Sequence, residues 1–158
     1  MIKLFALDVD GTLTDGGIYM DGNGNELKRF DVQDGYGLAD LLKRGIKVIF
    51  ISGRYSASTL QRAENLKITC CVNGTDDKLS DLKNIAGKYS LSYSEIAYAG
   101  DDIPDIECIK WAGIGLATAN ARKIVKEAAD WCSELCGGHG AVRDFAEYIV
   151  RFNEEENK

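Results

Sequence analysis

The chain has 158 residues, of which 45% are hydrophobic and 28% are charged, and it contains a single Pro. This composition predicts one domain spanning residues 1–158 and excludes disordered, collagenous and coiled-coil proteins. The formal net charge is −6, and no basic cluster is long enough to follow a nucleic-acid backbone. No apolar run approaches the roughly 20 residues that cross a bilayer, and the first residues do not have the pattern of a signal or transit peptide.

The five cysteines are irregularly spaced and do not form a disulfide framework. Their odd number favours a reducing compartment, so we expect a cytoplasmic protein without a nucleic-acid or membrane partner. Cys132, Cys136 and His139 offer only three potential zinc ligands, and no second CxxC pair accompanies them, so they make a poor zinc site. We therefore interpret the cysteines as small, partly buried hydrophobic residues.

Apolar runs and amphipathic segments alternate along the chain. The runs are typical of buried parallel strands and cover residues 3–8, 47–52, 68–73, 96–100 and 113–117. The amphipathic segments have helical spacing and cover residues 37–44, 56–66, 78–89 and 103–111. The alternation predicts an α/β fold with a doubly wound, mostly parallel, Rossmann-like sheet, which binds ligands beyond the carboxyl ends of its strands.

Residues 16–33 interrupt this alternation. Two extended arms, residues 17–20 and 26–32, flank a turn rich in Gly and Asn, which predicts a β-hairpin inserted after the first strand. The charged C-terminal tail, residues 153–158, is expected to fray. The glycine-rich loop at residues 137–140 has no apolar anchor, so we expect it to be mobile.

Polar residues gather just past the ends of the predicted strands. They are Asp8, Asp10, Ser52, Gly53, Arg54, Lys78, Asp101, Asp102 and Asp105. Each one alone is consistent with a turn or a helix cap, but parallel strands bring their carboxyl ends to one edge of the sheet. Clustered carboxylates repel one another and require a cation or raised pKa values. A hard divalent ion such as Mg²⁺ meets this requirement and leaves positions for phosphate oxygens.

Asp8 and Asp10 lie two residues apart, and an extended strand end places both side chains on one side. The first carboxylate can attack phosphorus to form an aspartyl-phosphate. The second can protonate the leaving alkoxide and later deprotonate the hydrolytic water. Ser52, the backbone N–H groups after it and Lys78 suit the oxygens of a phosphoryl group.

The segment Asp8-Val9-Asp10-Gly11-Thr12, with Ser52, Lys78 and residues 100–105, resembles the four motifs of the haloacid dehalogenase superfamily of phosphohydrolases. The resemblance implies that Asp8 is the nucleophile and Asp10 the general acid and base. It also implies that Ser52 and Lys78 bind phosphate, and that Asp8, the backbone carbonyl of Asp10, and Asp101 hold Mg²⁺. We expect Thr12 and Gly53 among the phosphate- and substrate-binding residues, and Asp102 and Asp105 in the layer behind the metal ligands.

Nearly the whole chain resembles a narrower family, the phosphatases acting on 3-deoxy-D-manno-octulosonate 8-phosphate. The segments that carry this resemblance are residues 13–16, 30–35, 51–54, 77–79 and 137–143. It implies a 2-keto-3-deoxy sugar-acid phosphate as substrate, within lipopolysaccharide precursor synthesis, and no large cap domain. It also implies a homotetramer in which the hairpins pack together and the neighbouring subunit covers the active site.

The residue after Gly53 helps to separate substrates within that family. Relatives acting on nine-carbon sialic-acid-type 9-phosphates tend to carry Glu there, whereas the octulosonate enzymes tend to carry Arg. Arg54 therefore favours the octulosonate, because a guanidinium suits a sugar-acid carboxylate, and the nine-carbon phosphate is the alternative substrate. Arg62 either adds charge at the site or lies on a solvated helix surface. Arg143 either reaches the phosphate or the sugar or is a charge at the start of a helix. We interpret His139 as a loop residue.

Two other classes of protein share some of these features. A receiver-type phosphoacceptor also has a doubly wound sheet, Mg²⁺ and a phosphorylated Asp, but its acceptor follows the third strand, where this chain has Asn73 and Gly74. A non-catalytic tetramerisation module is expected to lose catalytic carboxylates, and all of them are present here. The sequence therefore favours the phosphatase over both alternatives.

Overall fold

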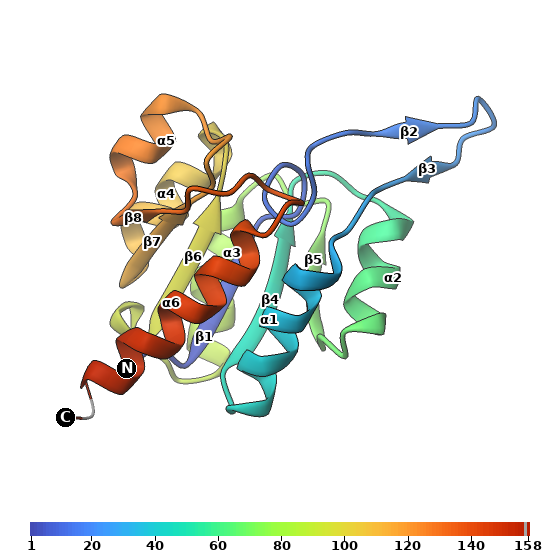
Figure 1. The fold of residues 1–158 in the computed structure, drawn as a ribbon. Coiled ribbons are helices and arrows are strands. Elements are labelled where there is room, and N and C mark those ends of the chain that lie inside the picture. The colour runs from blue at the N-terminus through green and yellow to red at the C-terminus, as the bar shows by residue number, and fades with distance from the viewer. Residues whose placement is uncertain (157) are drawn as a thin grey trace.

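One parallel sheet forms the centre of the computed structural model, which describes residues 1–156 and 158 (Figure 1). Its strands are β1 (Leu4–Leu7), β4 (Lys47–Ser52), β5 (Cys70–Asn73), β6 (Ile96–Gly100), β7 (Ile114–Ala117) and β8 (Trp131–Cys132). The order is β5-β4-β1-β6-β7-β8, and every neighbouring pair is parallel. The direction of winding reverses between β1 and β6, which confirms the predicted doubly wound α/β fold.

Helices cover both faces of this sheet (Figure 1). They are α1 (Val32–Lys43), α2 (Ala57–Asn65), α3 (Lys78–Lys88), α4 (Ile106–Trp111), α5 (Lys123–Ala128) and α6 (Ala141–Glu156), with short 3₁₀ turns η1 (Tyr93–Glu95) and η2 (Ile103–Asp105). Alternate residues of β1 point to opposite faces. Phe5 and Leu7 join the core beneath α1, α2 and α6, and Leu4 and Ala6 join the core beneath α3, α4 and α5. Among the described residues, no helix has the length and apolar character needed to cross a membrane.

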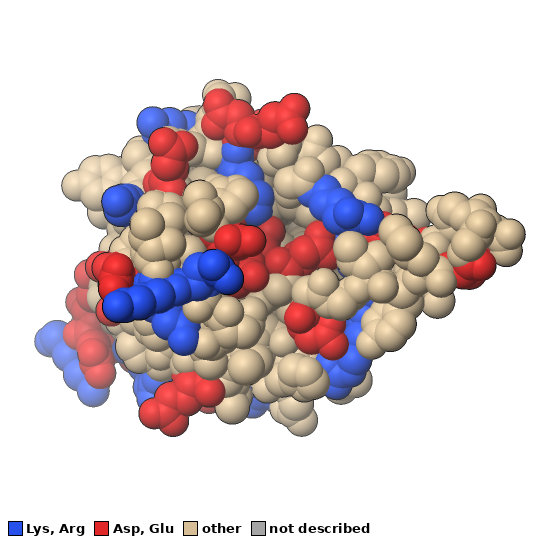
Figure 2. Space-filling model, turned by 90° about the horizontal axis from the view of Figure 1, so that it is seen from above, with Lys and Arg blue, Asp and Glu red and all other residues tan. Residues whose placement is uncertain are grey.

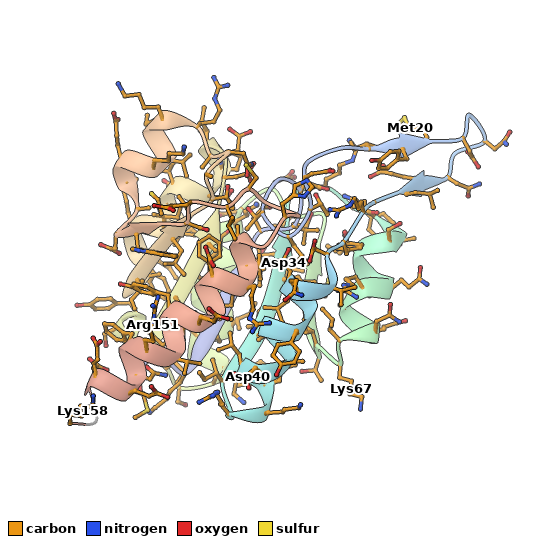
Figure 3. All side chains as sticks on the ribbon, in the orientation of Figure 1. Met20, Asp34, Asp40, Lys67, Arg151 and Lys158 are labelled. Carbon is orange, nitrogen blue, oxygen red and sulfur yellow. The ribbon has the colours of Figure 1, made fainter. Side chains whose placement is uncertain are left out.

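The predicted hairpin is present but shorter than expected. Strands β2 (Tyr19–Met20) and β3 (Glu26–Leu27) pair in antiparallel fashion and extend away from the sheet. Figure 3 places Met20 on the projecting part of the hairpin. The second arm does not reach Val32 as predicted, because Asp31 caps α1 by accepting a hydrogen bond from the N–H of Gln33 at 2.7 Å.

Helix α1 therefore begins at Val32, earlier than the predicted Gly37. Glycines within its first turns weaken the helical pattern in the sequence. Close packing explains one of them, because a Cβ atom at Gly37 would lie only 3.1 Å from Cα of Arg143 in α6. The tertiary contact between α1 and α6 thus outweighs the low helix propensity of this segment.

The C-terminal part of the chain contains elements that we did not predict, namely α5, β8 and α6. Helix α6 buries Val142, Phe145 and Ile149, which have helical spacing, against the sheet and α1. The prediction that residues 153–158 fray is wrong as far as Glu156, where the helix ends; position 157 lies outside the described residues. Asn153 anchors this end by accepting from the N–H of Ile2 (2.6 Å) and donating to its carbonyl (2.9 Å).

Replacing Asn153 tests this anchor. Asn153→Ala leaves both backbone groups of Ile2 without these hydrogen bonds, so we expect the free energy of unfolding to fall by about 1–3 kcal/mol in urea titrations. The matched control is Glu155→Ala on the exposed side of the same helix, which should change stability by less than about 0.5 kcal/mol. Equal stability of the two variants would contradict an anchored C-terminal helix.

Candidate active site

Carboxylates that follow neighbouring strands meet at the edge of the sheet where the winding reverses. Asp8 comes directly after β1 and Asp101 directly after β6, while Asp105 ends the η2 turn. One carboxylate oxygen from each of these residues lies within 4.8 Å of the others. Figure 2, which looks down on this edge, shows acidic side chains in the middle of the face with basic side chains beside them. Doubly wound folds bind their ligands at this position.

Lys78 lies between two of these carboxylates. Its Nζ donates to Oδ1 of Asp8 at 2.6 Å and to Oδ1 of Asp105 at 2.8 Å, and all three side chains are buried. Asp77 caps α3 by accepting from the N–H of Ser80, so Lys78 is held in the first turn of that helix. A single ammonium does not balance Asp8, Asp101 and Asp105, so the cluster carries an excess of negative charge when all three are ionised.

Asp105 organises the cluster from behind. Its Oδ1 also accepts from the hydroxyl of Tyr98 at 2.8 Å, and its Oδ2 accepts from the N–H groups of Asp101 (3.1 Å) and Asp102 (3.2 Å). Because both of its oxygens are engaged, Asp8 and Asp101 are the carboxylates best placed to bind a ligand. Asp102 is exposed, and its carboxylate accepts from the N–H of Ile103 at 2.8 Å, where it caps η2.

Thr12 and Gly11 bring the two ligand-facing carboxylates close together. The Thr12 hydroxyl lies 3.2 Å from Oδ2 of Asp8 and 3.2 Å from Oδ1 of Asp101, and its one proton can be donated to only one of them at a time. Gly11 has a φ of 87°, and a Cβ atom there would lie 2.1 Å from Oδ2 of Asp101. The turn after Asp10 therefore requires glycine both for its backbone conformation and for space.

The electrostatics of the cluster follow from this crowding. Burial, then repulsion from Asp105, raises the pKa of Asp8 well above its ordinary value although Lys78 opposes the shift. Burial also raises the pKa of Asp101 to about 6. For Lys78, burial acts to lower the pKa, but the attraction of Asp8 and Asp105 outweighs it, so its pKa is raised and the ammonium stays charged. A cation bound by Asp8 and Asp101 would relieve their repulsion.

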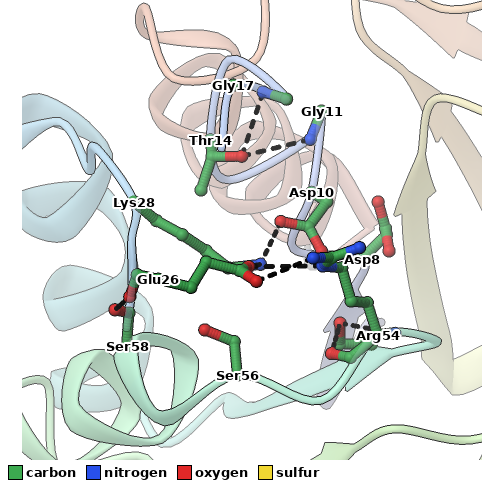
Figure 4. Close-up of polar contacts among 12 residues, drawn as sticks. Asp8, Asp10, Gly11, Thr14, Gly17, Glu26, Lys28, Arg54, Ser56 and Ser58 are labelled. Atoms are coloured by element: carbon green, nitrogen blue, oxygen red, sulfur yellow. Dashed lines mark hydrogen bonds and ion pairs between the residues drawn. The ribbon is translucent and has the colours of Figure 1, made fainter. Parts of the chain in front are cut away.

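The predicted residues at the end of β4 lie beside the cluster. Ser52 is buried, and its hydroxyl donates to the carbonyl of Arg54 at 2.9 Å. A Cβ atom at Gly53 would lie 3.7 Å from Cε of Lys78, so this backbone runs directly past the lysine. The Arg54 guanidinium pairs with Glu26 of the hairpin, with Nη2 to Oε2 at 2.7 Å and Nε to Oε1 at 3.3 Å (Figure 4).

Other candidate residues have their contacts elsewhere. The Arg62 guanidinium lies over the ring of Phe30 at 5.5 Å and donates to the carbonyl of Asp31 at 3.2 Å, so a role at the site stays a prediction. Arg143 pairs with Glu147 in α6 at 2.6 Å, and its guanidinium lies over a tyrosine ring. His139 is exposed, as expected for a loop residue.

The glycine-rich loop is anchored rather than loose. Asn120 donates to the carbonyl of Gly11 at 2.9 Å and accepts from the N–H of Gly137 at 2.6 Å. Arg29 donates to the carbonyl of Gly138 at 2.6 Å. These contacts contradict the expectation of a mobile loop, which rested on its lack of apolar side chains and overlooked polar anchors supplied by distant residues.

Lys28 is a further residue that we did not single out. Its side chain is fully buried and its ammonium pairs with the carboxylate of Asp10 (Figure 4). Lys28 lies just after β3, where the alternating pattern of a short hairpin arm gives no indication of which side chains turn towards the sheet. There is therefore little indication in the sequence that Lys28 is buried beside Asp10.

Comparison with known proteins agrees with this geometry. Residues 72–142 match the haloacid dehalogenase-like hydrolase family. The 3-deoxy-D-manno-octulosonate 8-phosphate phosphatase of Escherichia coli K12 is 38% identical over 149 residues, which cover 94% of this chain and 79% of that protein. The chain therefore belongs to the haloacid dehalogenase-like hydrolases.

Solved structures narrow the similarity to the octulosonate phosphatases. The Moraxella catarrhalis 3-deoxy-D-manno-octulosonate 8-phosphate phosphatase, in complex with magnesium, phosphate and KDO, has a TM-score of 0.93 and 42% identity over 95% of this chain and 86% of that one. The cobalt-bound deoxy-D-mannose-octulosonate 8-phosphate phosphatase of Haemophilus influenzae has a TM-score of 0.91 and 34% identity over 95% and 88% of the two chains. At these identities the similarity extends well beyond the fold.

The raised pKa of Asp101 predicts a pH-dependent stability. Between pH 3.8, the ordinary pKa of an aspartate, and pH about 6, the metal-free folded chain binds more protons at Asp101 than the unfolded chain does. The stability of the folded chain therefore rises as pH falls through this range. At pH about 7.5, Asp101→Asn should therefore melt roughly 2–4 °C higher than the wild type in EDTA, and this advantage should shrink at pH about 5. Asp102→Asn, a change at the neighbouring exposed cap, is the matched control and should show no such trend. A constant difference between Asp101→Asn and wild type across this range would contradict the assignment.

Proposed function

We propose that this protein is a Mg²⁺-dependent phosphomonoesterase that removes phosphate from a 2-keto-3-deoxy sugar-acid phosphate, specifically 3-deoxy-D-manno-octulosonate 8-phosphate. The observation that carries the proposal is the buried Asp8 carboxylate, held by Lys78 and lying beside Asp101 at the carboxyl edge of the sheet. The similarity to octulosonate 8-phosphate phosphatases over most of the chain supports the choice of substrate.

The residues present fit a magnesium ion. Carboxylate oxygens of Asp8 and Asp101 and the backbone carbonyl of Asp10 would form an all-oxygen set, which Mg²⁺ prefers. The charge that Lys78 leaves unbalanced favours a divalent cation over a neutral ligand. When bound, such an ion supplies charge stabilisation for the transferring phosphoryl group.

Asp8 is the proposed nucleophile. Its carboxylate oxygen forms a bond to phosphorus while the ester P–O bond breaks, and the electron pair of that bond goes to the leaving sugar oxygen. Asp10 gives its proton to this oxygen. Lys78, the backbone N–H groups around Gly53 and the Ser52 hydroxyl, once it turns from the carbonyl of Arg54, are the proposed donors to the phosphoryl oxygens.

Hydrolysis of the aspartyl-phosphate completes the cycle. The ionised Asp10 now accepts a proton from a water molecule, which attacks phosphorus and releases Asp8 and inorganic phosphate. Asp10 regains its proton in this step and is ready for the next turnover. A carboxylate that can act in both directions separates this chain from a receiver domain, which retains its phosphoryl group.

Arg54 is the proposed partner of the sugar-acid carboxylate. Its side chain is 47% exposed. The contacts to Glu26 use Nε and Nη2, so the donors of Nη1 remain for a substrate among the interactions of the described residues. Glu26 holds the guanidinium at the rim of the site, so that its Nη1 donors can bind a carboxylate oxygen of the substrate through a charge-assisted hydrogen bond.

We further propose that the chain acts as one phosphatase domain and assembles as a homotetramer through its hairpins. The hairpin exposes several large apolar side chains, which a partner surface would cover. They are Ile18, Tyr19, Met20 and Leu27. A cytoplasmic location stays a prediction from the cysteine content.

Phosphate release tests the proposed function directly. We expect steady Mg²⁺-dependent turnover of the eight-carbon 2-keto-3-deoxy sugar-acid 8-phosphate. Its kcat/KM should be at least tenfold above that of the nine-carbon 9-phosphate, which corresponds to a difference of about 1.4 kcal/mol in transition-state binding. Asp8→Asn should lower the rate by roughly 10³-fold or more and leave the fold intact, since removing one charge from the carboxylate cluster relieves repulsion. Asp40→Asn in α1 is the control and should keep the wild-type rate. A single stoichiometric phosphorylation without turnover would favour a receiver, and no reaction at all would favour an inactive module.

Substitution of Arg54 tests the recognition of the substrate carboxylate. Arg54→Met keeps the length of the side chain but removes its charge, so KM for the sugar-acid phosphate should rise by roughly tenfold or more, with little change for p-nitrophenyl phosphate, which has no carboxylate. Arg44→Met, at the far end of α1, is the matched control. Equal changes with both substrates would remove Arg54 from substrate recognition.

A further inference from the structure

The proposed reaction makes no use of the ion pair between Lys28 and Asp10. The Lys28 side chain has an exposure of 0%, and its ammonium contacts Oδ1 of Asp10, whose side chain is 24% exposed. Among the contacts of the described residues, Oδ2 of Asp10 accepts no hydrogen bond. The buried lysine therefore occupies one oxygen of the carboxyl and leaves the other open.

Glu26 holds Lys28 in this place. Its Oε1 lies 3.5 Å from the Lys28 ammonium, and the same carboxylate pairs with Arg54 (Figure 4). The backbone carbonyl of Glu26 accepts from the hydroxyl of Ser58 at 2.9 Å, which ties the hairpin arm to α2. Charges of alternating sign thus run from Asp10 through Lys28 and Glu26 to Arg54.

We propose that Lys28 is a positioning residue for the reaction and fixes the Asp10 carboxyl so that its open oxygen faces the leaving group. This inference rests on the proposed function, in which Asp10 protonates that group. Asp10 precedes Gly11, whose backbone has a positive φ, and among the described residues the contact with Lys28 is the one hydrogen bond that its side chain makes. Misplacement of an acid by about 1 Å can cost roughly 100-fold in rate, so such a restraint has a measurable effect.

Stability alone does not account for a lysine at this position. Burial of an ammonium group is costly, and hydrophobic residues of similar volume commonly replace both partners of a buried ion pair at no loss of stability. Arg54 already satisfies the carboxylate of Glu26 through a bidentate contact. Apolar residues at both positions could therefore fill the same space, so the pair is better explained by the orientation that it gives to the Asp10 carboxyl.

The leaving-group dependence of kcat/KM distinguishes positioning from a structural role. This parameter covers the steps up to ester cleavage and does not include hydrolysis of the aspartyl-phosphate. During cleavage the ester oxygen receives the P–O electron pair and the Asp10 proton. A stable leaving anion such as p-nitrophenolate departs without that proton, whereas phenolate gains from it. Loss of Asp10 orientation should therefore impair phenyl phosphate more than p-nitrophenyl phosphate.

The experiment compares Lys28→Met with wild type on these two esters, in Mg²⁺. We expect kcat/KM to fall by roughly 30-fold or more for phenyl phosphate and by no more than about threefold for p-nitrophenyl phosphate. Lys123→Met is the matched control, since the Lys123 side chain is 91% exposed and pairs with Glu127 of the same helix, and it should leave both values unchanged. Equal losses on the two esters would overturn the inference, as would wild-type values for both.

A second variant covers the case in which Lys28→Met does not fold, as judged by circular dichroism. Glu26→Gln keeps Lys28 but removes the charge that holds it, and it should shift the ratio of the two kcat/KM values in the same direction by a smaller factor. An unchanged ratio would overturn the inference. Wild-type protein that hydrolyses neither these esters nor the sugar-acid phosphate would instead contradict the proposed function, so the two failures are distinguishable.

Discussion

The buried contact of Lys78 with Asp8 and Asp105 is the interaction on which the site depends, because it balances only part of the charge gathered there. Asp101 adds a further carboxylate within 4.8 Å. Such a cluster must take up protons or a cation, and the pKa of about 6 for Asp101 marks the proton-binding alternative. A site that can exchange protons for a divalent cation is suited to an anionic phosphoryl group, which a permanently neutral pocket would not attract.

The charges further from the sheet are arranged differently. Asp10 and Glu26 alternate with Lys28 and Arg54, so this outer array is neutral without any added ion when both carboxylates are ionised. The inner cluster is therefore the part that requires a cation, whereas the outer array orients side chains. The division follows the architecture: the inner residues come from strand ends, the η2 turn and α3, while Glu26 and Lys28 come from the inserted hairpin. The hairpin thus connects a proposed substrate-binding arginine with the proposed general acid.

The sequence was most informative where its signals are local. Buried strands followed by Asp8, Ser52 and Asp101 could be predicted because apolar runs and strand-end polar residues are adjacent in the chain. The start of α1 was misplaced because its glycines are explained only by tertiary packing, which for Gly37 is against α6. The pairing of Lys28 with Asp10, and of Arg54 with Glu26, depends on how the hairpin folds back, which spacing along the chain does not encode. The apolar face of α6 was visible in the sequence but was not assigned.

The glycine-rich loop shows why local composition misled the prediction of its mobility. A Cβ atom at Gly137 would lie 2.1 Å from the carbonyl oxygen of Gly11, so the loop packs backbone against backbone on the turn that carries Asp10 and Thr12. Asn120 bridges the same two backbones, and its hydrogen bonds would break if the loop lifted away. Glycine is needed here for close approach rather than for flexibility. A loop held in this way braces the turn that follows β1, so its glycines serve the geometry of the carboxylate cluster rather than movement of the loop.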